Sequence, residues 1–312
     1  MRESGQKIIS SFLAASISFC VTGVTQITWA SVPASQLQNL IQESLQQTQQ
    51  GQHQQALATL QQAVALARQL NDSKTEGIAL LGTGLNYKSL GQFRLALDFD
   101  SEARAIFKEL GNHALEAGAL NNIGEVYRSA RQPQKALVAF NQALPMLKEL
   151  GQRDLEAKIL NNIGLAYQDM KQSKKALSFF NQALPVLRQV GDRAGSGVVL
   201  NSTGLAYQNL KQYQKALSFF NQALSISEEV GDLEGQATTL NNIGTLYQHI
   251  GQPQKALEFL NRALPILRNL GSRSLEAQAL DNIGLVYRSL GKRQTALEFR
   301  EQAERIRKSL EL

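Results

Sequence analysis

The stretch LNNIGEVY at residues 120–127 decides the fold, because the chain repeats it four more times at a constant interval. It returns as LNNIGLAY at 160–167, LNSTGLAY at 200–207, LNNIGTLY at 240–247 and LDNIGLVY at 280–287. A second stretch, QKALVAFNQAL at 134–144, recurs at the same interval of 40 residues. A fixed period of this length is typical of a solenoid of stacked units.

Each 40-residue unit contains two helical patterns. In the unit 111–150, Leu120, Ile123 and Tyr127 recur at helical spacing with Gly124 on the same stripe. These patterns predict one helix over about 112–130 and a second over about 133–150. Glycine inside a helix costs roughly 1 kcal/mol against alanine, so its recurrence predicts close contact with the second helix. The partners expected there are the small residues Ala136, Ala176, Ala216 and Ala256.

The composition indicates a globular chain with no nucleic-acid partner. Of its 312 residues, 43% are hydrophobic and 6% aromatic, and the formal net charge is +6. The basic residues are spread through every repeat along the sequence, which favours a solvated outer face. A nucleic-acid stripe would need local clustering with stacking aromatic residues, and neither is visible in the sequence.

The first 34 residues have the layout of a secretory signal peptide. Arg2 and Lys7 precede an uncharged, mostly apolar and small stretch at 8–30, and small-residue cleavage motifs follow at 28–30 and 32–34. We therefore expect export to the periplasm of a bacterium or secretion. The alternative is an uncleaved membrane anchor at residues 8–30, which is long enough to span a bilayer. Cleavage would remove Cys20 and leave no cysteine.

Catalysis is not supported by the sequence. His53, His113 and His249 fall at different offsets in the repeat, and the carboxylates are scattered. No combination has the spacing of a metal site or a catalytic triad. We expect no catalytic residue, no metal and no cofactor.

These repeats resemble the tetratricopeptide repeat. The pattern of that family is matched by Leu240, Ile243-Gly244, Tyr247, Gly251, Ala256, Leu260 and Ala263. The resemblance implies an all-α, right-handed superhelical solenoid of antiparallel helix pairs with about seven repeats. They would be a shorter unit at 35–70 with a degenerate first helix, full units at 71–110, 111–150, 151–190, 191–230 and 231–270, and a last unit at 271–312 with a C-terminal capping helix.

The 40-residue form is similar to the long-helix subclass of kinesin light chains and Pins-type adaptors, and to bacterial arrays fused to caspase-like CHAT peptidases. In that family the first helices line a concave groove that binds peptides. The resemblance therefore implies a non-enzymatic scaffold for a peptide segment or partner protein.

The candidate binding residues lie on the polar arc of the first helices. Stacked repeats turn each offset into a stripe: one of amides, one of glutamine or arginine, and a partly apolar line between them that Leu85 would continue. Amides match a peptide backbone, and a row of leucines suggests a partner surface. The predicted site comprises Asn121, Asn161, Asn201, Asn241, Asp281, Leu165, Leu205, Leu285, Arg128, Gln168, Gln208, Gln248 and Arg288.

Three alternatives accompany this hypothesis. The chain could be a self-associating assembly protein that buries the leucines, or a regulatory subunit of a separately encoded peptidase. The Asn121 stripe could be merely solvated. The adjacent asparagines, Asn122, Asn162, Asn242 and Asn282, are expected to be structural, with hydrogen bonds to a turn of a neighbouring unit. Arg128 and Arg288 would favour an acidic partner.

Overall fold

The computed structural model describes residues 32–311, and within this range all regular secondary structure is α-helical. The helices are α2 (Val32–Gln49), α3 (His53–Gln69), α4 (Ser73–Ser89), α5 (Phe93–Glu109), α6 (His113–Ser129), α7 (Pro133–Glu149), α8 (Arg153–Asp169), α9 (Ser173–Gln189), α10 (Arg193–Asn209), α11 (Tyr213–Glu229), α12 (Leu233–His249), α13 (Pro253–Asn269), α14 (Arg273–Ser289) and α15 (Arg293–Glu311). The two helices predicted within 111–150 are confirmed as α6 and α7, with ends that differ by at most one residue.

The predicted signal segment lies almost wholly outside the described residues. Only 32–34, the second candidate cleavage motif, fall inside them, and they form the first turn of α2. Among the helices of residues 32–311, none combines the length and the apolar character that crossing a bilayer requires.

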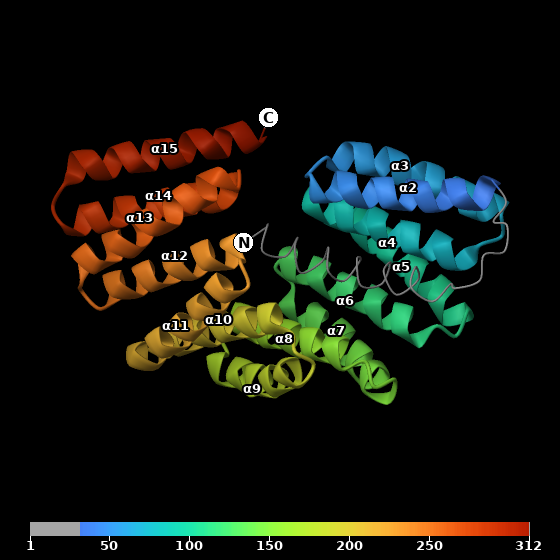
Figure 1. Ribbon diagram of the computed structural model, residues 1–312, viewed down its shortest axis with the longest axis horizontal. Helices are drawn as coiled ribbons and strands as arrows, with labels where there is room; N and C mark the ends of the chain where they lie inside the picture. Colours follow the sequence, from blue (N-terminus) through green and yellow to red (C-terminus); the bar gives the residue numbers. More distant parts are fainter. Residues whose placement is uncertain (1–31, 312) are drawn as a thin grey trace. The chain divides into compact units, whose positions relative to one another are not determined.

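Two compact units divide the chain between Met170 and Lys171. The amino-terminal unit contains α2 to α8 in its described part, and the carboxy-terminal unit contains α9 to α15 (Figure 1). In each unit, helices that follow one another pack as antiparallel neighbours, joined by short turns. The even-numbered helices are the first helices of the repeats, and the odd-numbered helices are the second.

The first helices of neighbouring repeats also contact each other within a unit. These contacts join α2 to α4, α4 to α6 and α6 to α8, and likewise α10 to α12 and α12 to α14. Consecutive second helices have no comparable contact in the described residues. Each unit therefore brings its first helices together on one side, which we call the inner face.

Glycine in the first helices α4, α6, α10, α12 and α14 lets the second helix approach closely. A Cβ atom at Gly124 would lie 2.4 Å from Cε1 of Phe140, and one at Gly204 would lie 2.6 Å from the ring of Phe220. The predicted close packing is therefore confirmed. Alanine carbonyls also take part, because Ala96, Ala256 and Ala296 each place the backbone oxygen 3.1 Å from the corresponding Cβ position of Gly84, Gly244 and Gly284.

Caps and left-handed turns delimit the helices. Asp72, Asn112, Asp192 and Asp232 are N-cap residues whose side chains accept a hydrogen bond from the backbone N–H three residues on. Most turns place glycine at positive φ, but three turns between first and second helices use a basic residue instead. These are Arg131, Lys171 and Lys211, with φ of 58°, 60° and 58°. A side chain in this conformation costs roughly 1–2 kcal/mol.

We predict that Gly124→Ala lowers the free energy of unfolding by about 1–2 kcal/mol, measured by urea denaturation. The added methyl collides with the Phe140 ring, and overpacking costs about 1–3 kcal/mol, which exceeds the roughly 1 kcal/mol gained in helix propensity. In a Phe140→Ala background the same change should cost nothing, because the ring is gone. An equal loss in both backgrounds would contradict close packing as the cause.

Candidate partner-binding surface

Side-chain amides link the first helices of neighbouring repeats in a ladder. Nδ2 of Asn242 donates to Oδ1 of Asn201 at 3.0 Å, and Nδ2 of Asn282 donates to Oδ1 of Asn241 at 2.9 Å. In the amino-terminal unit, Nδ2 of Asn162 donates to Oδ1 of Asn121 at 2.8 Å. In every link, the donor belongs to the later repeat and the acceptor to the earlier one. We call these side chains the asparagine ladder.

The structural role expected of the asparagines next to the stripe holds for Asn162, Asn242 and Asn282, but their expected partner was wrong. They bond to an amide oxygen of the preceding repeat and not to a turn. Asn122 has no such link, because Leu81 stands at the acceptor position one repeat earlier. In these three inter-repeat hydrogen bonds, the asparagines predicted to be structural therefore donate, and those predicted to bind a partner accept.

The predicted amide stripe is more buried than a freely exposed surface would be. Asn121, Asn161 and Asn241 are 1%, 6% and 7% exposed, and Asn201 is half-buried. A merely solvated stripe is therefore excluded for the three buried residues. Asp281, at the end of the stripe, forms an ion pair with Arg307 of α15.

In the carboxy-terminal unit, the ladder uses the side-chain oxygens of Asn201 and Asn241 but not their Nδ2 donors. The oxygens of Asn201 and Asn241 are fixed by the next repeat, and their Nδ2 groups donate to no residue within 32–311. In the amino-terminal unit the corresponding donor is used, because Nδ2 of Asn121 donates to Glu125 at 3.0 Å. The inner face of the carboxy-terminal unit thus holds amide donors in a set orientation.

The predicted apolar line is not a continuous exposed row. Leu85 is buried at 4% exposure, Leu165 and Leu205 are half-buried, and only Leu285 reaches 37%. Leu205 packs against the core cluster that contains Leu240, Ile243 and Leu246 of α12, which explains its low exposure. The half-buried Leu205 and the exposed Leu285 are the apolar side chains that this face of the carboxy-terminal unit offers.

The predicted stripe of glutamine and arginine residues makes different contacts from one repeat to the next. Arg128 pairs with Asp169 at 2.9 Å, whereas Arg288 is exposed. Gln168, Gln208 and Gln248 are half-buried, and Oε1 of Gln208 is buried with no hydrogen-bond partner among the described residues. The predicted residues of the carboxy-terminal unit therefore share one face but carry little charge apart from Arg288 and the paired Asp281.

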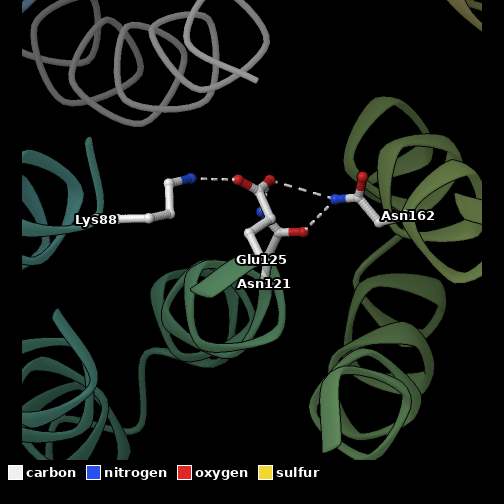
Figure 2. A network of polar contacts seen from close by, with 4 residues as sticks. All are labelled: Lys88, Asn121, Glu125 and Asn162. Atoms are coloured by element: carbon white, nitrogen blue, oxygen red, sulfur yellow. Dashed lines mark hydrogen bonds and ion pairs between the residues drawn. The ribbon is translucent and has the colours of Figure 1, made fainter. Parts of the chain in front are cut away.

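Sequence reasoning missed a charged network on the inner face of the amino-terminal unit. Nζ of Lys88 in α4 lies 2.7 Å from Oε2 of Glu125 in α6, with the two side chains 12% and 10% exposed. Asn121 and Asn162 donate to the other carboxylate oxygen at 3.0 and 3.3 Å, so the network joins three consecutive first helices (Figure 2). The available signal was Glu125 at an offset where most other repeats have leucine and one has Thr245.

Asp100 lies beside this network, at the position where other second helices carry Phe140, Phe180 or Phe220. Its side chain is fully buried, and neither carboxylate oxygen has a hydrogen bond of acceptable geometry to a described residue. Burial raises the pKa of Asp100 well above its usual range; Lys88 opposes this shift, the negative charge of Glu125 adds to it, and the nearby Asn122 amide opposes it. Asp100 is thus a carboxyl group that folding favours in its protonated form.

We predict that Lys88→Met lowers the free energy of unfolding by about 2 kcal/mol or more, because it leaves the Glu125 carboxylate nearly buried without its cation. Leucine occupies the Glu125 offset in most other repeats, so the double variant Lys88→Met/Glu125→Leu should recover most of the loss. Urea denaturation of the two single variants and the double variant measures the coupling. Additive losses would contradict a direct ion pair.

We predict that Asp100 makes the protein less stable as pH rises. The folded chain retains a proton on Asp100 that the unfolded chain releases above its ordinary pKa of about 4, so unfolding becomes easier from there up to the raised folded pKa. Asp100→Asn should match the wild type at pH 4 and exceed it in stability at pH 8. Urea midpoints measured across this range test this, and parallel curves for the two proteins would contradict it.

The described residues contain no group of three or more His, Cys, Asp or Glu side chains placed to hold a metal ion. The chain has the features of a helical-repeat protein, because its helices pack in pairs and its first helices are joined by side-chain hydrogen bonds. The tetratricopeptide repeat family matches residues 45–109, 84–149, 115–189, 155–229, 196–269 and 235–309. The chain therefore belongs to the tetratricopeptide repeat family.

Several solved structures share this fold at low sequence identity. A Rap conjugation gene regulator in complex with the Phr peptide has a TM-score of 0.68 at 16% identity, covering 92% of this chain and 79% of its own. A Rap protein complexed with competence and sporulation factor has 0.62 at 14%, covering 99% and 97%. A putative kinesin light chain repeat protein of Podosopora anserina has 0.52 at 18%, covering 64% and 99%. Comparison with curated proteins found no match.

Proposed function

We propose that this protein is a non-enzymatic scaffold that binds an extended peptide segment on the inner face of its carboxy-terminal unit. The observation that carries the proposal is the fixed orientation of Asn201 and Asn241, whose Nδ2 donors have no partner in the described residues. Donors repeated along consecutive first helices suit the carbonyl groups of an extended main chain.

The remaining side chains of this face fit the same occupant. Leu205 and Leu285 offer apolar contact, and Gln208 and Gln248 offer further amide groups. Arg288 is exposed near the C-terminal end of α14 and favours a carboxylate on the partner. One structure of the same fold was solved in complex with the Phr peptide and another with competence and sporulation factor, and the first supports a peptide as the partner class.

Export and the absence of catalysis belong to this proposal as well. The uncharged stretch at 8–30 supports export of the mature scaffold to the periplasm or beyond. A peptide-binding role requires no reaction, and the three histidines fall at unrelated places: His53 contacts Asn86, His113 lies near Glu116, and His249 is exposed.

The sharpest substitution at the ladder is asparagine to aspartate. Alanine would remove the oxygen that accepts the inter-repeat hydrogen bond, so it would weaken the fold as well as any binding. Aspartate retains an acceptor for Asn242 or Asn282 and replaces only the free donor. A carboxylate already stands at this offset in α14, where Asp281 is half-buried and pairs with Arg307.

We predict that Asn201→Asp/Asn241→Asp weakens peptide binding at least about ten-fold, since two donors are lost and carboxylates face peptide carbonyls. The carboxylate at position 241, where the side chain is 7% exposed, also lowers the melting temperature, so binding is compared at a temperature at which both proteins are fully folded. The measurement is selection from a random twelve-residue display library on the wild-type protein, followed by titration of the enriched peptides. Asn221→Asp/Asn269→Asp, which makes the same charge change at exposed sites on α11 and α13, is the matched control.

Equal binding of the selected peptides to wild type, ladder variant and control would refute the ladder as the site. If no peptide is enriched and the wild type forms an oligomer that the ladder variant does not form, the inner face joins copies of the chain. That outcome would replace peptide binding by self-assembly.

A further inference from the structure

One edge of the carboxy-terminal unit collects basic side chains without any acidic residue. The edge lies where first helices end and second helices begin, around the turns between them. It comprises residues 171–176, 208–216, 248–256 and 288–296. Its basic residues are Lys171, Lys174, Lys175, Lys211, Lys215, Lys255, Arg288, Lys292 and Arg293. We call this surface the basic edge.

Helix packing gathers residues that are far apart in the sequence. Neighbouring helices of this unit are antiparallel and in contact, so alternate turns lie on the same side; the turns between α12 and α13 and between α14 and α15 illustrate this (Figure 1). Residues 40 positions apart therefore become neighbours. Taken alone, the even spread of basic residues along the sequence favours a solvated face. In the folded unit, however, these residues cluster at one edge.

The basic edge differs from the opposite edge in how its charges are balanced. At the opposite edge, Arg268 and Arg273 lie 3.0 and 2.7 Å from Glu276, and Arg193 pairs with Glu229. On the basic edge no ion pair within the described residues involves Lys171, Lys174, Lys211, Lys215, Lys255, Arg288, Lys292 or Arg293. The first carboxylates beyond it are Asp169, which precedes Lys171 by two residues and pairs with Arg128, and Glu258 and Glu298, in the second turns of α13 and α15.

The charges of this edge are also held in regular positions. Nζ of Lys215 lies 5.4 Å from the centre of the Tyr207 ring, and the same contact recurs between Lys255 and Tyr247 at 5.4 Å. Lys292 lies 5.8 Å from the centre of the Tyr287 ring. Cation–π contacts of this kind place one ammonium group per repeat close to the turn.

Lysine is retained at two turn positions where the backbone favours glycine. Lys171 and Lys211 have φ of 60° and 58°, whereas the later turns use Gly251 and Gly291 at φ of 76°. A side chain kept in a left-handed conformation points to a use for that side chain. Here it adds a cation at the outermost point of the turn.

We propose that the basic edge binds the surface of an anionic lipid bilayer. The edge is a row of turns, so it suits a planar partner better than a peptide, which needs a groove. The segment 8–30 predicts that the chain meets a membrane during export or anchoring, and a bilayer is the anionic surface found there.

The composition of the edge argues against single-stranded nucleic acid as the occupant. Such a partner stacks its bases on exposed aromatic side chains. Tyr213 lies within these stretches and is half-buried against the core. Tyr207, Tyr247 and Tyr287 directly precede three of them, but each ring stacks on a phenylalanine of the next helix and has a lysine ammonium over it, which leaves no free ring face for a base. The residues between the lysines include the glutamines Gln172, Gln212, Gln214, Gln252 and Gln254.

The test compares two four-site variants of the full chain that lose the same charge. The edge variant is Lys211→Gln/Lys215→Gln/Lys255→Gln/Lys292→Gln. The control is Lys74→Gln/Lys108→Gln/Lys148→Gln/Arg188→Gln, whose four residues are exposed and lie near turns of the opposite kind, from a second helix to the next first helix. Both proteins retain segment 8–30, so its apolar contribution is the same in each.

Binding is measured by co-sedimentation with vesicles of phosphatidylcholine alone and with added phosphatidylglycerol. A basic residue near an anionic surface strengthens binding roughly five-fold at low salt. We expect the wild type to prefer the anionic vesicles, the edge variant to lose at least about twenty-fold of that preference, and the control to lose less than about three-fold. Replacing the same four lysines by arginine should preserve binding, and added salt should abolish it.

Three results would overturn the proposal. They are equal losses in the edge and control variants, equal binding of the wild type to neutral and anionic vesicles, and tighter binding to a single-stranded oligonucleotide or to polyglutamate than to the anionic vesicles at the same salt. The lysines replaced in the edge variant are not part of the asparagine ladder, so the ladder variant should keep the preference for anionic vesicles. Arg288, which lies at both surfaces, is unchanged in both variants.

Discussion

The close contact between paired helices at the glycines of the first helices is the constraint on which the rest of the structure depends. At Gly124, Gly204 and Gly244, a side chain from the second helix lies where a Cβ atom would be. This approach sets the geometry within each helix pair, and the next pair packs against it in the same way. First helices then come within reach of each other, so that short side chains such as asparagine can join them.

The architecture could be predicted from the sequence because it depends on a pattern that recurs. Helix bounds, the all-α class and close packing at glycine follow from the period and from local propensity, and the helices agree with them. The burial of Asn121 could not be predicted in this way. A helical wheel gives a helix one apolar and one polar side, whereas the first helix α6 contacts four other helices, α4, α5, α7 and α8. Its polar side is partly an interface with another repeat.

The charged network of the amino-terminal unit could not be predicted from the sequence for a different reason. Nothing in the neighbouring sequence distinguishes Lys88, Asp100 and Glu125 from other charged residues, and they lie in three different helices, α4, α5 and α6. What marks them is departure from the repeat: Glu125 replaces leucine and Asp100 replaces phenylalanine. In a repeat protein, a substitution at a position that is apolar in the sister units is therefore more informative than the identity of the residue alone. Whether such residues pair or stay apart depends on packing distances that no one-dimensional pattern contains.

The direction of the asparagine ladder gives the array a chemical polarity. Each link takes its hydrogen-bond donor from the later repeat and its acceptor from the earlier one, so a repeat needs its C-terminal neighbour to satisfy its amide oxygen. An array cut on the C-terminal side of a linked repeat would expose an amide oxygen, whereas a cut on the N-terminal side would expose an amide donor. The two ends of a shortened array would therefore differ in the hydrogen-bonding groups that they present to a neighbour.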